Sequence, residues 1–187
     1  MVPPPAGPPV RAPVRPRAVP LELLARPLDF LVAEHQRQKE MCLLLEAVAD
    51  GREWGKGLAE HLVLFLTDEM ALHRADEEDD LFDLMRRRCS RDDDIGSLIH
   101  RVWSPEQADE EVQLSTHLLD RLASNRTDCR EAFAERAHRY VALLRLHVAY
   151  TNGILIPLGR RRLRSSDLAG LAKRMRRRRG LPSQIPG

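Results

Sequence analysis

The chain is poor in residues and motifs that mark several common protein classes. Aromatic residues make up only 4% of its 187 residues, and its three cysteines, Cys42, Cys89 and Cys129, form no C-x-x-C motif. An odd number of cysteines without that motif argues against a disulfide framework and against a thiolate zinc site. Because a Gly-rich phosphate loop, a Rossmann fingerprint and a nucleophile triad are also missing, the sequence disfavours ordinary hydrolases and nucleotide-dependent enzymes.

Signals for membrane insertion and export are also missing. No apolar run reaches the ~18 residues that a transmembrane helix requires. Residues 1–20 contain Pro and Arg but lack the apolar core of a signal peptide. With the cysteine usage, this predicts a cytoplasmic protein without a membrane span.

What the chain does contain favours helices. Hydrophobic residues make up 43% and charged residues 31% of the chain, with few β-branched runs. We expect an all-α protein, an antiparallel up-down four-helix bundle over residues 22–162. A disordered Pro/Arg-rich arm over 1–21 precedes it, and a short basic C-terminal helix and tail over 163–187 follow it. The bundle helices are expected at about 27–49, 57–88, 95–123 and 128–161, and the basic helix at 166–179.

Two prolines fall inside these expected helices. Pro105 either begins a second piece of the third helix or kinks it, and Pro157 is expected to bend or end the fourth helix. Ser166 and Gly180 are typical residues for the two ends of the basic helix.

A polar pattern occurs twice along the chain, at nearly the same separation. A pseudo-repeat of two helical hairpins with polar inner faces is how a four-helix bundle builds a metal site in its core. The second copy has changed at two of these positions, which leaves the completeness of the site open. The first copy is Glu34-His35 with His73 and Glu77, and the second is Glu106-Gln107 with His147 and Thr151.

The inner faces of the four helices carry groups that bind cations. Helical spacing places these groups on apolar stripes that converge on the bundle axis. Buried charges need partners, and a metal ion supplies one; imidazole with carboxylate suits iron, manganese or zinc. A single histidine on such a stripe is more often a hydrogen-bonded core residue, but this set spans four helices. The candidate metal ligands are His35, His73, Glu77, Glu111 and His147, with Gln107 beside Glu111.

Three segments of the chain resemble the hemerythrin-like, or HHE cation-binding, family. They are residues 28–35 (LDFLVAEH), 73–82 (HRADEEDDLF) and 147–158 (HVAYTNGILIPL), and the resemblance extends over about residues 22–162. The family fold is an antiparallel four-helix bundle around a non-haem di-iron centre. Its members are implicated in dioxygen binding, in iron or oxygen sensing, and in peroxide or nitric-oxide chemistry. The resemblance therefore implies iron as the cofactor.

The resemblance also implies roles for the candidate ligands. His35 matches the ligand of the first helix, and His73 and Glu77 match the ligand and the bridging carboxylate of the second. Glu111 matches a ligand on the third helix, one turn beyond the family's Glu-His pair. His147 matches the ligand of the fourth helix.

Two positions depart from the family pattern. Gln107 stands in place of the third-helix histidine, and Thr151 in place of the fourth-helix bridging carboxylate. An amide oxygen is a weak, neutral ligand, and a threonine hydroxyl cannot bridge two cations. Three interpretations stay open: a weakened di-iron site with added water ligands, a single-metal site, and a degenerate domain that retains only the fold.

These observations predict a non-haem iron protein that binds or senses dioxygen or another small oxidant, or that handles iron. Open coordination positions favour reactivity with small oxidants. One alternative is a di-iron oxidase or peroxide-consuming enzyme. Another is a metal-free bundle that uses its Arg-rich tail to bind an acidic protein partner.

Several other residues receive weaker predictions. Asp80 is expected either to orient a ligand imidazole or to face solvent. The arginines of segment 160–179 are a weak signal for nucleic acid, because no aromatic residues are interleaved with them, and can equally pack on the acidic second helix. Tyr140 and Tyr150 are expected to be core residues. The remaining histidines, His61, His100, His117 and His138, are expected on the surface.

Overall fold

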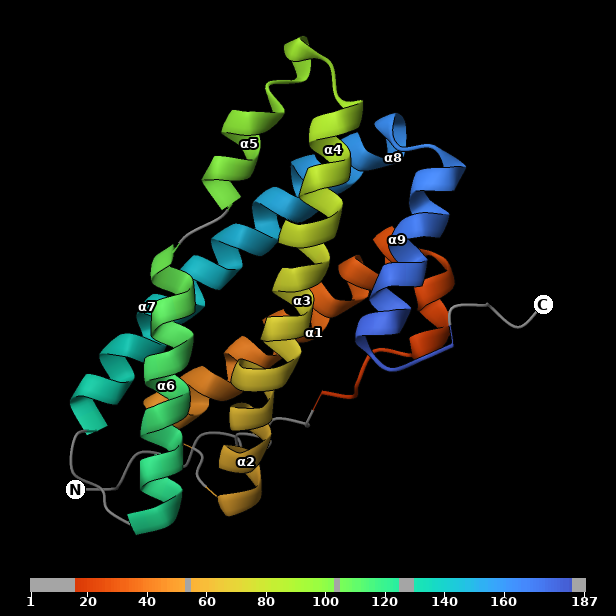
Figure 1. Cartoon of the computed structure of the whole chain (residues 1–187). Coiled ribbons are helices and arrows are strands. Elements are labelled where there is room, and N and C mark those ends of the chain that lie inside the picture. Colours follow the sequence, from red (N-terminus) through yellow and green to blue (C-terminus); the bar gives the residue numbers. More distant parts are fainter. Residues whose placement is uncertain (1–15, 53–54, 103–104, 125–129, 183–187) are drawn as a thin grey trace, which may run out of the picture.

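Helices form all of the regular structure in the part of the chain that the computed structural model describes, residues 16–52, 55–102, 105–124 and 130–182 (Figure 1). Four helical rods pack into a bundle, which confirms the predicted all-α four-helix architecture. The first rod is α1 (Pro27–Ala49) and the second runs from α2 to α4. The third consists of α5 and α6, and the fourth of α7 and α8. The remaining bounds are α2 (Lys56–Leu64), α3 (Met70–Ala75), α4 (Phe82–Arg88), α5 (Ile95–Val102), α6 (Pro105–Ser124), α7 (Arg130–Tyr150), α8 (Ile156–Arg162) and α9 (Ser165–Arg178).

Short helical segments of other types join or interrupt these rods. The second rod contains two π-helical segments and the fourth contains one. Such segments shift the register of the side chains and are frequent at functional sites. The π-helical segments are η2 (Phe65–Glu69), η3 (Asp76–Leu81) and η5 (Thr151–Leu155), and the 3-10 segments are η1 (Leu21–Ala25) and η4 (Arg91–Asp93).

Most helix ends follow the expected turn chemistry, but two expectations fail. Ser166 does not cap α9, because the N-cap is Arg164 and Ser166 is the second residue of the helix. Gly51 follows α1 with a φ of 70°, and Gly180 follows α9 with a φ of 68°, the left-handed conformation that glycine accepts readily. Pro105 is the first residue of α6, where a missing N–H costs little. Pro157 was expected to bend or to end the fourth helix, and it does not end it. Pro157 lies in the first turn of α8, directly after the π-helical turn, and the rod continues to Arg162.

The predicted N-terminal arm lies mostly outside the described residues. Residues 16–20 have no regular structure and run along α1, where the Arg37 guanidinium donates hydrogen bonds to the carbonyl oxygens of Pro16 and Arg17. The boundaries of the arm and of the C-terminal segment stay predictions.

Two apolar clusters fill the bundle, one toward each end. One joins the C-terminal half of α1 to α2, α6 and α7, and includes Met41, Leu62 and Leu144. The other joins the N-terminal half of α1 to α4, α8 and α9, and includes Leu31 and Leu81. Along each rod the sequence passes from one cluster to the other, and polar residues lie at the crossing.

By length and composition alone, one helical span among the described residues, Glu131–Arg162, is apolar enough to cross a membrane. Its residues pack against α1, α5 and α6 inside the bundle. The core helix of a bundle passes the same criterion, so this span is weak evidence for a membrane segment.

A matched pair on α1 tests the packing of the bundle. Leu44 is 1% exposed and its neighbour Leu43 is 56% exposed. Leu44→Ala should lower the free energy of unfolding by about 2–5 kcal/mol, because it removes buried methyl groups and leaves a cavity. Leu43→Ala should change it by less than about 0.5 kcal/mol. Urea unfolding of the metal-free protein measures both, and equal losses would contradict the assigned face of α1.

Candidate metal site

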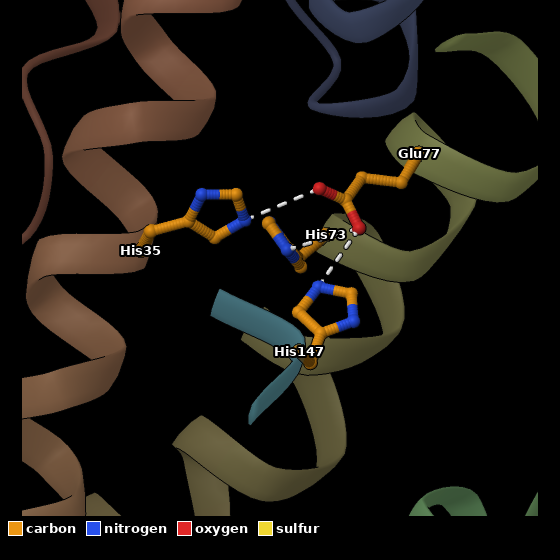
Figure 2. Close-up of side chains that lie close together, drawn as sticks. All are labelled: His35, His73, Glu77 and His147. Carbon is orange, nitrogen blue, oxygen red and sulfur yellow. Dashed lines mark hydrogen bonds and ion pairs between the residues drawn. The ribbon is translucent and has the colours of Figure 1, made fainter. Parts of the chain in front are cut away.

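Three histidines and one glutamate from three rods meet at the crossing between the two apolar clusters (Figure 2). His35 comes from α1, His73 from α3, Glu77 from η3 and His147 from α7. His35, His73 and Glu77 are at most 2% exposed, and the His147 side chain is 11% exposed. The apolar clusters on both sides keep bulk water away from these groups.

The four side chains point toward one another. The Nε2 atom of His35 lies 3.1 Å from Oε1 of Glu77, and Nε2 of His147 lies 3.0 Å from its Oε2. His73 Nε2 lies 3.7 Å from the same Oε2 atom. The ligand atoms of all four residues are within 4.8 Å of one another, close enough to surround one ion. Glu77 therefore faces three imidazoles across one small space (Figure 2).

The opposite nitrogen of each imidazole has its own acceptor. His73 Nδ1 lies 3.0 Å from Oε2 of Glu34, and His147 Nδ1 lies 3.1 Å from the backbone carbonyl oxygen of Val102. His35 Nδ1 lies 2.7 Å from Oδ1 of Asn152. These oxygens accept hydrogen bonds, so Nδ1 is the donor in each ring. Each neutral ring then presents the lone pair of its Nε2 atom to the interior.

This arrangement requires a positive charge at the centre. A bare imidazole lone pair and a carboxylate oxygen repel each other at 3.0–3.1 Å unless a proton or a metal ion lies between them. The buried Nε2 of His73 also has no hydrogen-bond partner among the residues that the structure describes. Three neutral imidazoles with one carboxylate form a donor set that a divalent transition metal accepts. The residues present therefore fit a cation.

The pKa values of these groups reflect the same crowding. Burial lowers the pKa of His35, although Glu77 partly offsets this effect. For His73, burial acts in the same direction, but the carboxylates of Glu77 and Glu34 outweigh it and raise the pKa. Burial alone would raise the pKa of Glu77, but in the metal-free protein the facing rings of His147 and His73, when they carry a proton at Nε2, hold it well below its usual range. Glu77 is therefore an anion in the folded protein.

The π-helical segments explain how the sequence places these groups. η3 begins three residues after His73 and carries Glu77, and η5 begins directly after the turn that carries His147. The added residue in a π turn rotates the following side chains relative to an α-helix. In η5 this places the Asn152 carboxamide on His35, and in η3 it buries Asp76 and Asp80 beside Glu77.

Glu111, the fifth predicted ligand, lies outside this group of donors. Its carboxylate forms an ion pair with Arg74 and accepts a hydrogen bond from the Tyr140 hydroxyl at 3.2 Å. Gln107 donates to it at 3.4 Å. Arg74 follows His73 on α3, so its guanidinium provides Glu111 with a positive charge that a second metal ion would otherwise supply. The ligand role of Glu111 stays a prediction.

The structure also places the remaining candidates. Thr151 is fully buried, and its hydroxyl has no hydrogen-bond partner in the described part of the chain. The expectation that Asp80 orients an imidazole or faces solvent is wrong, because Asp80 is 5% exposed and forms ion pairs with Arg174 and Arg178. Tyr140 is a core residue, as expected. His100 and His138 are exposed, whereas His61 and His117 are partly buried.

Sequence reasoning missed the three groups that orient the imidazoles. Glu34 is the sequence neighbour of His35, but adjacent residues of a helix point to different sides, so the spacing does not indicate its contact with His73 on another rod. Asn152 has a neutral side chain, and the local spacing of the sequence does not indicate that its carboxamide oxygen reaches His35 on another rod. The Val102 carbonyl, which accepts from His147, lies in the last turn of α5, and the last carbonyl groups of an α-helix have no partner within the helix.

The fold and the site define a class: a four-helix bundle with a buried histidine and carboxylate site for a cation. The hemerythrin HHE cation-binding domain matches residues 26–177. Because the match covers most of the chain, this protein belongs to the hemerythrin HHE family. The match continues past residue 162 into α9. Neither a curated protein nor a solved structure matches the chain.

The anionic state of Glu77 leads to a prediction for the metal-free protein. Unfolded Glu77 takes up a proton near the ordinary value of 4.5, whereas folded Glu77 does so only at a lower pH. Between these two values the unfolded state binds more protons, so stability falls as the pH falls. Urea unfolding from pH 7 to pH 3 should show a shallower acid loss for Glu77→Gln than for the wild type. The exposed Glu131→Gln control should follow the wild type, and identical slopes in all three proteins would contradict the assignment.

Proposed function

We propose that this protein binds one iron ion through His35, His73, Glu77 and His147 and uses it to bind or sense dioxygen or another small oxidant. The observation that carries this proposal is the set of buried Nε2 atoms facing Glu77, because that geometry needs a cation. When bound, iron supplies reversible one-electron chemistry and affinity for small oxidants. The chain supplies the four donors and the acceptors that fix their orientation.

The choice of iron rests on the donors and on the family. Neutral imidazoles with one carboxylate suit iron, zinc, copper or nickel, whereas magnesium and calcium prefer oxygen ligands throughout. Membership in a cation-binding family with this fold favours iron among them. Four protein donors leave coordination positions for small molecules on a metal that accepts five or six ligands.

One ion is favoured over two by the contacts of Glu111. A second ion needs ligands of its own. Of the buried carboxylates on α6, Glu110 is paired with Arg136 and Arg139, which leaves Glu111 as the candidate. That carboxylate is paired with the guanidinium of Arg74 and hydrogen-bonded to Tyr140. Thr151 and Gln107 provide only neutral oxygens on this side. A second ion would have to displace the partly exposed guanidinium of Arg74 from the buried Glu111 carboxylate and would therefore cost this ion pair.

A cavity of about 200 Å³ beside the site provides room for a small molecule. His73 and Glu34 form one wall, and most of the remaining lining is apolar, including Phe30, Phe65 and Met70. Dioxygen is small and apolar, and such a cavity admits it at little desolvation cost. The cavity supports a role in binding or sensing a small oxidant.

Metal stoichiometry tests the site directly. The wild-type protein, purified anaerobically and loaded with ferrous iron, should retain about one equivalent, because four donors surround one ion. Glu77→Gln should lose most of the iron, whereas Glu111→Gln should retain it. This pair of buried glutamates is a matched control, because both variants remove one negative charge from the interior. Elemental analysis and the upward shift in Tm with iron measure the outcome.

Three results would contradict the single-iron proposal. Two equivalents of iron, with an oxo-bridge charge-transfer band after air exposure, would support the di-iron interpretation instead. Loss of iron in Glu111→Gln would place Glu111 among the ligands. Absence of iron binding and of any Tm shift in the wild type would leave a metal-free bundle. His100→Ala, at an exposed histidine, should behave as the wild type in every measurement.

The cavity leads to a separate prediction for reactivity. Val19 is a partly buried residue of the cavity wall and is not part of the donor set. Val19→Trp should fill the space and slow oxidation of the ferrous protein by air, while the iron content stays at the wild-type level. Leu43→Trp, at an exposed position, is the control. Stopped-flow absorbance measures the rate, and an unchanged rate in Val19→Trp would separate the cavity from oxidant access.

A further inference from the structure

The basic C-terminal helix is bound along the acidic side of the site. α9 contacts η3, η1 and α1, and lies beside the second rod in the bundle (Figure 1). The arginines at the end of α9, with Arg179 directly after it, are paired with acidic residues of η3 and with Glu34 of α1. The ion pairs are Arg174–Asp80, Arg178–Asp80, Arg178–Asp76, Arg179–Asp76 and Arg179–Glu34.

Arg179 differs from the other arginines of this segment in what it contacts. Its Nη2 atom lies 3.0 Å from Oε1 of Glu34, and its Nη1 atom lies 2.6 Å from Oδ2 of Asp76. The guanidinium carbon also lies 4.8 Å from the centre of the Phe30 ring, a cation–π contact. The side chain is only 8% exposed. One buried guanidinium therefore joins α1 to η3.

The carboxylate of Glu34 is shared between Arg179 and a candidate metal ligand. Its Oε1 atom accepts from Arg179, and its Oε2 atom accepts from Nδ1 of His73. A carboxylate held at one oxygen only can rotate, whereas one held at both has a fixed plane. That plane sets the direction of the His73 ring and therefore the direction of its Nε2 lone pair.

We propose that Arg179 is a positioning residue of the cation site: it fixes Glu34, which orients His73, and it ties α9 to the segment that carries Glu77. This inference rests on the proposed function, because it concerns the same four donors. The C-terminal helix is then part of the metal site, although it provides no ligand. Lysine cannot replace Arg179 fully, because one ammonium group does not reach two carboxylates with the planar fork of a guanidinium.

Three glutamine variants separate positioning from simple docking of the helix. Arg179→Gln removes the contacts to Glu34 and Asp76. Arg178→Gln loosens α9 at Asp76 and Asp80 but leaves Glu34 in place. Arg177→Gln, at an exposed position of the same helix, is the surface control. All three variants remove one positive charge, so they share any general electrostatic effect.

The first readout is metal affinity. Arg179→Gln should raise the Kd for ferrous iron by about 10-fold, the lower end of the effect expected when a group that orients a ligand is lost. Arg178→Gln and Arg177→Gln should change the Kd by much less, and Arg179→Lys should lie in between. An Arg178→Gln variant as weak as Arg179→Gln would show that helix docking alone matters and would overturn the proposal.

The second readout needs no metal. In the metal-free protein with ¹⁵N-labelled histidine, the Nδ1–H proton of His73 should give a resonance protected from exchange by Glu34. Arg179→Gln should shift this resonance or lose its protection, and Arg177→Gln should not. If the wild type binds no iron, this measurement still tests the contact, so failure of the proposed function is distinguishable from failure of the inference.

A double-mutant cycle closes the test. If Arg179 acts through Glu34, then Arg179→Gln should have little further effect on the Kd in a Glu34→Gln background. Additive effects of the two substitutions would show that Arg179 acts independently of Glu34 and would overturn the relay. Far-ultraviolet circular dichroism of each variant confirms that the helices are intact before the comparison is made.

Discussion

The repulsion between three imidazole lone pairs and one carboxylate, buried together, is the constraint on which the rest of the structure depends. In water these groups would be separately solvated, but here they are nearly fully buried between two apolar clusters. In such surroundings the attraction between opposite charges is stronger, and a buried charged or polar group without a partner costs more free energy. The arrangement is therefore stable only with a cation or with protons at its centre.

The charges around the site are arranged to leave that central position to Glu77. The neighbouring carboxylates have arginine partners: Glu34 with Arg179, Asp76 with Arg178 and Arg179, Asp80 with Arg174 and Arg178, and Glu111 with Arg74. Glu77 contacts imidazoles instead. An extra anion beside the site would compete for the same cation, and each guanidinium removes one such competitor. The arginines therefore leave Glu77 as the buried carboxylate that faces the imidazoles.

The fold was largely predictable because it follows from local periodicity. The 3- and 4-residue spacing of Leu31, His35, Gln38 and Cys42 on α1 fixes the face of that helix, and a glycine and a proline mark its ends. The convergence of His35, His73, Glu77 and His147 follows from the same periodicity, because stripes on neighbouring rods must meet at the axis. What periodicity could not show was the π-helical register of η3 and η5. Their shift brings Asn152 to His35 and buries Asp80 against α9, contacts that depend on tertiary packing rather than on spacing.

The two halves of the pseudo-repeat balance their buried carboxylates in different ways. In the first half, His73 and Glu77 present donors to a shared space that fits a cation. In the second half, Glu111 occupies the corresponding interior, but its balancing charge comes from Arg74, a residue of the first half. Once a guanidinium supplies that charge, a carboxylate at position 151 would add an unmatched anion, and the neutral Thr151 avoids this cost. Arg74 and Glu111 are therefore a pair whose charges depend on each other, and the buried Thr151 adds no charge to the interior of the bundle.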